Sequence, residues 1–248
     1  MNGALAAFAF FPGLAIGSFL NVVAVRVPAR LSIVRPGSTC QSCSAPIAWY
    51  DNVPVVSWLL LRGRCRNCKA PIPVKYPIVE LGTALLVSAC VLRFGATADA
   101  FVCALFCAVL VTISVTDLER RVIPNRVVLP AAAIVLAGRT LVHPSPAWAI
   151  AAVAGAAFLL VAALAYPGGL GMGDVKLALL LGAALGKTLP VGLMAGMLAA
   201  LVPSILLLAR HGQAARKMAI PLGPFLAGGA LLALFAGEPI LHAYLHLV

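Results

Sequence analysis

The feature that most constrains this chain is a series of apolar stretches, each about 17 to 25 residues long, separated by short polar segments. Hydrophobic residues make up 62% of the sequence and charged residues only 10%, and the mean hydropathy is +1.06. A soluble core does not use that much apolar surface. The sequence therefore predicts an all-α polytopic membrane protein.

Hydropathy predicts about eight transmembrane helices. The expected spans are 4–25, 77–94, 100–116, 126–142, 147–166, 175–187, 188–209 and 219–236. The spans 175–187 and 188–209 form a nearly continuous apolar block, in which only Gly186, Lys187 and Pro190 indicate a turn. If that block is a single span, the count is seven.

The distribution of basic residues predicts the orientation. No Lys or Arg precedes Arg26, so the first segment lacks the basic region of a cleavable signal peptide and is expected to remain as a span. With eight spans, fifteen basic residues fall on one side and three on the other. The positive-inside rule places the loop 26–76 in the cytoplasm and both termini outside.

The formal charge of +11 therefore reflects membrane topology. The basic residues flank spans and form no nucleic-acid-binding module, so we expect no nucleic-acid partner. Contacts with anionic membrane lipids are expected instead.

Two of the seven acidic residues, Asp117 and Asp174, end or begin apolar segments at the predicted cytoplasmic edge. The other acids lie in the large loop, on the outer side, or near these edges: Asp51, Asp99, Glu238, Glu119 and Glu80. Elimination leaves Asp117 and Asp174 as the best candidate pair.

Two neighbouring carboxyl groups cannot both ionise cheaply, so one is expected to hold a proton while the other is charged. Such a pair can activate water and protonate a scissile carbonyl without a covalent intermediate. The alternative is that each aspartate caps a helix. Gly168, Gly169, Gly171 and Gly173 disfavour a continuous helix before Asp174, which suits either an open site or a simple loop.

Metalloprotease and serine-protease chemistry are disfavoured, because the sequence contains neither HExxH nor GxSxG.

Four cysteines form two CxxC units in the loop 26–76, at Cys40, Cys43, Cys65 and Cys68. This spacing is typical of a tetrahedral structural Zn²⁺ site, which would hold together a loop with little apolar sequence to bury. Disulfides are the alternative, and a reducing cytoplasm disfavours them.

We thus expect a first helix at 1–25, a zinc-ribbon-like loop domain at 26–76 and a transmembrane peptidase domain at 77–248. The three cysteines on apolar spans are expected to be inert buried thiols.

Several motifs together resemble the type IV prepilin peptidases, a family of GxGD membrane aspartyl proteases. The motifs are GSFLNVVAVRVP (17–28), the double CxxC loop, YPIVELG (76–82), DLERRVIPN (117–125), GMGDVKL (171–177) and IPLGPFLAGG (220–229). They occur in order over most of the chain.

The resemblance implies a multi-pass protein of the bacterial cytoplasmic (inner) membrane that cleaves the basic leader of type IV prepilins or pseudopilins. Asp117 and Asp174 match the catalytic pair. Members with the cysteine loop also methylate the new N-terminus with S-adenosylmethionine. Glu80 is a candidate for methyl transfer or a helix N-terminal acid. Lys176 matches the GDxK pattern or is an interfacial lysine.

Two other classes remain open. A proton-coupled transporter would use the two aspartates for alternating access, but it predicts internal repeats that the halves of the sequence do not show. A non-enzymatic scaffold of a secretion machine would need the cysteine loop but not the aspartates.

Overall fold

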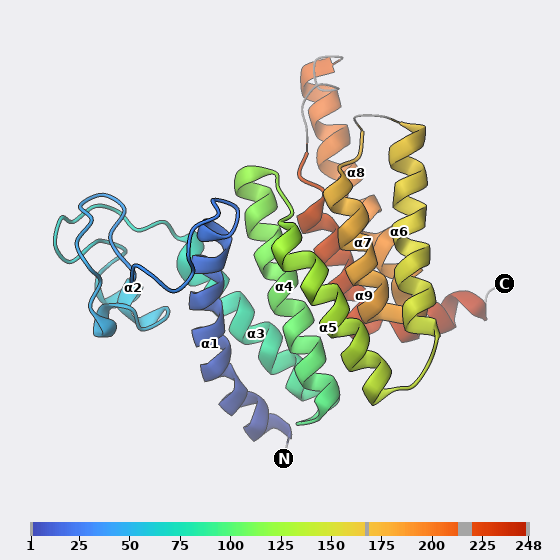
Figure 1. Cartoon of the computed structure of the whole chain (residues 1–248), viewed down its shortest axis with the longest axis horizontal. Coiled ribbons are helices and arrows are strands. Elements are labelled where there is room, and N and C mark those ends of the chain that lie inside the picture. The colour runs from blue at the N-terminus through green and yellow to red at the C-terminus, as the bar shows by residue number, and fades with distance from the viewer. Residues whose placement is uncertain (1, 167–168, 213–219, 247–248) are drawn as a thin grey trace. The chain divides into compact units, whose positions relative to one another are not determined.

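The computed structural model of the protein describes residues 2–166, 169–212 and 220–246. Its regular structure in these ranges is helical, apart from two isolated bridge pairs. The chain divides into two compact units, Met1–Thr112 and Ile113–Val248, and α4 (Ala98–Arg120) passes from the first into the second (Figure 1). Gly168 of the predicted glycine break and two of the counted basic residues, Arg216 and Lys217, lie outside the described residues.

Seven segments of the described chain are long and apolar enough to cross a membrane, which confirms the predicted class. They are Asn2–Arg26, Lys75–Phe94, Ala98–Arg120, Asn125–Val142, Ala147–Ala165, Met172–His211 and Gly223–Leu245.

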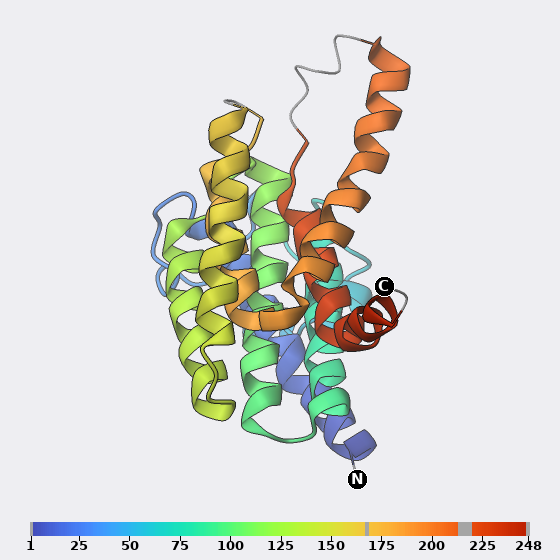
Figure 2. The same cartoon turned by 90° about the vertical axis from the view of Figure 1, so that its right-hand side faces the viewer.

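The segment Met172–His211 is not one helix. It contains α7 (Met172–Leu185), a single 3-10 turn, η2 (Gly186–Thr188), and α8 (Leu189–His211). The break falls where Gly186 takes a φ of +54°, a conformation that favours glycine, and Figure 2 shows the chain turning there. The predicted spans 175–187 and 188–209 thus correspond to two helices. The candidate spans of the described chain number seven because the 40 residues of Met172–His211 count as one apolar segment.

In the first unit, α1 (Asn2–Arg26) and α3 (Lys75–Phe94) form an antiparallel hairpin. Ser88 bonds the carbonyl of Ala6 near one end, and Asn21 bonds the carbonyl of Tyr76 near the other. Close approach depends on a small residue on α1, since a side chain at Gly17 would come within 2.6 Å of the Glu80 backbone.

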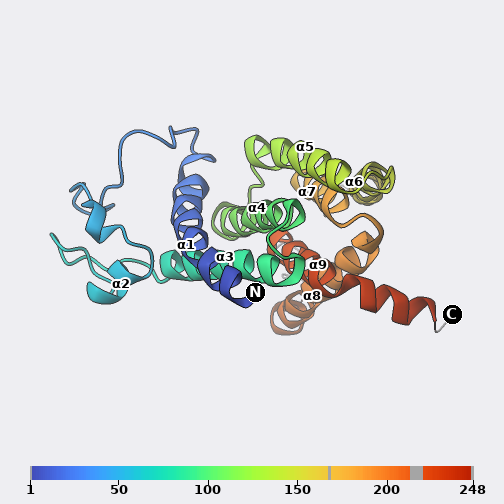
Figure 3. The ribbon, with the colours of Figure 1, turned by 90° about the horizontal axis from the view of Figure 1, so that it is seen from below.

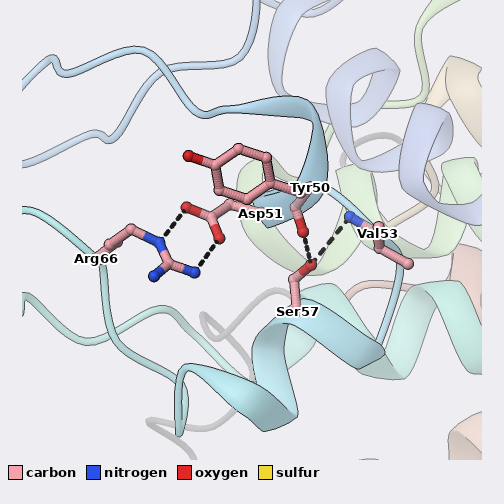
Figure 4. A network of polar contacts seen from close by, with 5 residues as sticks. All are labelled: Tyr50, Asp51, Val53, Ser57 and Arg66. Atoms are coloured by element: carbon pink, nitrogen blue, oxygen red, sulfur yellow. Dashed lines mark hydrogen bonds and ion pairs between the residues drawn. The ribbon is translucent and has the colours of Figure 1, made fainter.

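The predicted loop domain connects the two helices of this hairpin. It contains a 3-10 turn, η1 (Trp49–Asp51), and the short helix α2 (Val56–Leu60). Arg66 binds Asp51 through Nε and a terminal guanidinium nitrogen, both at 2.7 Å (Figure 4). Ser57 donates to the carbonyl of Tyr50 and accepts from the N–H of Val53. These bonds link η1 to α2 and to the second CxxC unit.

In the second unit, α7 is the central helix, and most of its residues are buried. It packs against α5 (Asn125–Val142) and α6 (Ala147–Ala165), as Figure 3 shows, while α8 packs against α9 (Gly223–Leu245). Arg139 on α5 donates from Nε to the carbonyl of Ala184 at 3.0 Å, and its guanidinium stacks over Trp148 on α6. This contact fixes the end of α7 that lies opposite Asp174.

Candidate active site and metal centre

Asp117 lies in the last turn of α4 and is almost fully buried. Its Oδ2 accepts a hydrogen bond from the backbone N–H of Gly223, the first residue of α9, at 2.8 Å. Any side chain at position 223 would collide with this carboxyl group, because an added Cβ would lie 2.8 Å from Oδ2. Glycine is therefore required here by close approach. Because Asp117 stands at a helix C-terminus, its geometry is not that of an N-terminal helix cap.

Asp174 lies in the first turn of α7 and is partly buried. Its Oδ2 accepts from the N–H of Gly171 at 3.2 Å, while its own N–H donates to the Gly171 carbonyl at 3.0 Å. This reciprocal arrangement is a helix N-terminal cap, as the capping alternative predicted for this residue. A capping bond uses one carboxyl oxygen and leaves the other for chemistry.

The structure brings the two aspartates together. The carboxyl groups of Asp117 and Asp174 lie within electrostatic range of each other, and Arg121 lies within range of Asp117. All three residues belong to the second unit. The pair therefore joins the end of α4 to the start of α7, with α9 supplying a backbone donor.

A second contact ties the Asp174 turn to the segment after α4. Lys176 donates from Nζ to Oδ1 of Asn125, the first residue of α5, at 2.9 Å. A Cβ added at Gly173 would lie 3.0 Å from Cβ of Ile123, so the two backbones approach closely here. Both contacts set where α7 begins relative to the end of α4, and hence where Asp174 lies relative to Asp117.

Glu80 does not lie with the aspartates in the second unit; it belongs to the first. It is the sixth residue of α3, beyond the first turn, so it is not a helix N-terminal acid. Its buried Oε2 accepts from the N–H of Val55 at 2.7 Å. Glu80 therefore anchors the start of α2 to the hairpin of α1 and α3.

The four loop cysteines converge. Their sulfur atoms all lie within 4.8 Å of one another, and those of Cys40 and Cys68 are 3.8 Å apart. Four thiolates around a tetrahedral Zn²⁺, at about 2.3 Å each, place sulfurs roughly 3.8 Å apart. A disulfide needs about 2.05 Å, and the four cysteines are free thiols. The donor set fits a metal better than it fits disulfides.

The two CxxC units have the same local structure. In each, the first cysteine N–H bonds the carbonyl of an alanine five residues later, and the residue after the second cysteine has a positive φ. Backbone N–H groups of Cys43 and Ser42 lower the pKa of the Cys40 thiol to about 6, whereas, despite the backbone N–H of Ala70, burial and hydrogen bonds with the other three thiols raise the pKa of Cys68 to about 11. A thiol that ionises readily is a suitable metal ligand.

The sequence reasoning missed several residues that shape these sites. Each of these residues forms a hydrogen bond with a partner distant in sequence: Gly223 with Asp117, Asn125 with Lys176 and Val55 with Glu80. One signal was visible: the pattern CxxCxAPI occurs twice, at 40–47 and at 65–72, and it indicates two equivalent metal-binding turns.

Comparison with known proteins identifies related families. Residues 11–94 match the bacterial peptidase A24 N-terminal domain, and residues 104–209 match the type IV leader peptidase family. No solved structure gives a significant match.

Several curated relatives carry the name prepilin leader peptidase/N-methyltransferase. The protein from Bacillus subtilis is 33% identical over 95% of this chain and 96% of its own length. One from Burkholderia pseudomallei is 35% identical over 96% of this chain and 87% of its own. The Myxococcus xanthus protein is 43% identical over 82% of this chain, and the match spans 64% of that relative's length.

Proposed function

The chain belongs to the type IV leader peptidase family, and on this basis we propose that it is a membrane aspartyl endopeptidase. Its substrates are type IV prepilins or pseudopilins, and it removes their basic leader peptide at the cytoplasmic face of the bacterial inner membrane. The seven apolar segments of the described chain agree with a multi-pass inner-membrane protein.

One observation carries the proposed chemistry. Asp117 and Asp174, separated in sequence by the whole of α5 and α6, approach within electrostatic range, and each accepts a backbone N–H bond on Oδ2. Oδ1 of each carboxyl group takes no part in these two bonds. The backbone donors orient the carboxyl planes without supplying a competing charge.

In the proposed mechanism, the ionised carboxylate removes a proton from water as the water oxygen attacks the scissile carbonyl carbon. The protonated carboxyl donates its proton to the carbonyl oxygen, which gives a neutral tetrahedral intermediate. When the carbon–nitrogen bond breaks, the first aspartate returns its proton to the departing amine, and the second aspartate takes a proton back from a hydroxyl of the intermediate, which becomes the leader carboxyl group. The products are a free leader carboxyl group and a new N-terminus, and no covalent enzyme intermediate forms.

The charge of the substrate agrees with this site, since a leader rich in Lys or Arg is attracted to carboxylates. The orientation proposed from the basic-residue count has loop 26–76 in the cytoplasm and both termini outside. Because this needs an even number of crossings, the proposal counts α7 and α8 as two separate crossings.

We also propose that the protein methylates the new N-terminal amine, with S-adenosylmethionine as the methyl donor. The support is the name that the curated relatives carry, together with the match of residues 11–94, which include the cysteine loop, to the bacterial peptidase A24 N-terminal domain. Transfer moves a methyl group from the donor sulfonium to the amine nitrogen and releases one proton. Mass spectrometry of the processed substrate would show one added methyl group in the presence of the donor; an unmodified N-terminus under the same conditions would refute this activity.

The cysteine cluster is proposed to hold one structural Zn²⁺ through Cys40, Cys43, Cys65 and Cys68. Bound there, the metal would cross-link two turns of a domain with few buried apolar residues.

The transporter alternative has no support from the relatives, which are named as enzymes. Loss of the aspartates in a processing assay distinguishes a peptidase from a transporter. Asp117→Asn and Asp174→Asn variants are co-expressed with a prepilin, and leader removal is followed by electrophoretic mobility. We expect neither variant to process the substrate, whereas an Asp51→Asn control in the loop should retain processing. Normal processing by either site variant would refute the peptidase assignment.

A further inference from the structure

The loop domain carries an excess of positive charge that the proposed peptidase chemistry does not use. Between Val27 and Val74 the sequence has six basic residues and a single acidic one, Asp51. That acid is already engaged, because Arg66 holds it through two hydrogen bonds (Figure 4). The ion pair lowers the pKa of Asp51 below its usual value, so it stays ionised and committed to Arg66.

Three of the remaining cations line one cavity. It measures about 500 Å³ and is bordered by Leu61, Arg62, Arg64, Cys65 and Lys69. All three cationic side chains are exposed. No carboxylate lines this cavity, so it is suited to an anion.

The turn that presents these cations is fixed before any ligand binds. Trp58 donates from its indole N–H to the carbonyl of Ile72 at 3.0 Å. Gly63, with a φ of +65°, packs against the Trp58 ring, and its N–H bonds the Trp58 carbonyl at 2.8 Å. The cavity is therefore preorganised, which reduces the entropy cost of binding.

The helix next to the cavity exposes an apolar face. On α2, Leu59 is 61% exposed and Leu60 is 79% exposed. The preceding residue, Val55, bonds Glu80, which lies five residues into α3, or roughly 7.5 Å along the helix axis. This bond places the start of α2 level with the second turn of α3. Because α3 is a candidate span, that level corresponds to a depth at the membrane edge. Apolar side chains at that depth meet the boundary between lipid headgroups and acyl chains.

We propose that the loop domain binds an anionic phospholipid, with the phosphate-bearing headgroup in the cavity of Arg62, Arg64 and Lys69 and the acyl chains against Leu59 and Leu60. This lipid site does not depend on the proposed peptidase function. It gives the excess positive charge of the loop domain a ligand, and it anchors the metal-binding turns on the membrane surface.

The test uses full-length protein in a neutral detergent, titrated with phosphatidylglycerol, phosphatidylcholine or inorganic phosphate, with bound molecules counted by native mass spectrometry. The wild type should prefer phosphatidylglycerol. An Arg62→Gln/Arg64→Gln variant should bind it about 30-fold more weakly, the loss expected for two cations near an anionic surface.

A matched control is Arg30→Gln/Arg35→Gln, which removes the same charge from the same loop. Arg30 and Arg62 both have a positive φ, at +58° and +52°, so each variant replaces one residue in this backbone conformation. The control should lose no more than about threefold, since these cations lie outside the cavity. Equal losses in both variants would overturn the site, because they would show only diffuse charge attraction.

Two further comparisons identify the ligand. Inorganic phosphate that displaces the lipid at equal concentration would overturn the lipid assignment in favour of a free phosphate site. Leu60→Ser should weaken phosphatidylglycerol binding more than Val34→Ser does, although both side chains are at least 75% exposed. Equal effects would refute the role of α2. Unchanged metal content in each variant shows that the loop domain is folded.

Discussion

Replacing Gly223 by alanine perturbs Asp117 without touching any ionisable group. The added Cβ would lie 2.8 Å from Oδ2 of Asp117, 3.2 Å from its Cγ and 3.3 Å from its Cβ. Asp117 is short and buried, so the carboxyl group cannot rotate away as a long surface side chain would. Either α9 or the carboxyl group must shift, and the 2.8 Å bond from the Gly223 N–H is lost or lengthened.

The expected cost follows from that bond. A hydrogen bond to a charged group contributes about 1.5–3 kcal/mol, which corresponds to roughly a 10- to 150-fold loss in kcat/KM. The assay is cleavage of a purified prepilin by the detergent-solubilised enzyme, with initial rates measured over a range of substrate concentrations. The loss should appear mainly in kcat, because Asp117 is proposed to act on the reacting atoms rather than to bind the leader.

Gly228→Ala is the matched control on the same helix. A Cβ at this position meets nothing within 4 Å, and alanine is favoured over glycine in a helix by about 0.5–1 kcal/mol. It should keep wild-type activity. If Gly223→Ala is as active as Gly228→Ala, the Gly223 donor does not position the carboxyl group, and the reasoning is wrong.

Three further outcomes are expected. Purified protein should contain about one zinc ion per chain, and Cys65→Ser should lose most of it while Cys103→Ala, outside the cluster, keeps it, as metal analysis would show. Lys176→Met and Asn125→Ala should each lower kcat/KM, and their effects should couple by about 0.5–1 kcal/mol in a double-mutant cycle; strict additivity would refute the contact. Gly173→Ala should lower kcat with little change in the yield of folded protein, because its new Cβ presses on the segment before α5; unchanged kinetics would contradict this.

Much of the fold was predictable because the bilayer limits the choices. Uninterrupted apolar stretches of span length allow helices and little else, and the predicted spans match the observed helices to within a few residues at most ends. The largest shift is at the last helix, which ends at Leu245 rather than 236. There, the helix continues through Glu238 and Pro239.

The aspartate pair was predictable because charge is rare in this sequence, so few candidates competed. Its supporting contacts were not. Gly223 lies 106 residues from Asp117, and Lys176 lies 51 residues from Asn125. No local pattern encodes which helix N-terminus meets a distant carboxyl group, since that depends on how α9 packs in the second unit. Likewise, Glu80 was expected to serve methyl transfer or to be a helix N-terminal acid, and neither alternative indicated its bond to Val55, which depends on a loop whose path the sequence does not show.

The central claim is that Asp117 and Asp174 work as one acid–base pair. Its most direct test is single-turnover cleavage of a prepilin by Asp117→Asn, Asp174→Asn and the double variant, since residues that act as a unit have non-additive effects. Each single variant should lose about 10²- to 10⁴-fold in rate, and the double variant should be no slower than the slower single one. If the two losses multiply, or if either single variant cleaves at the wild-type rate, the two carboxyl groups do not act as a pair.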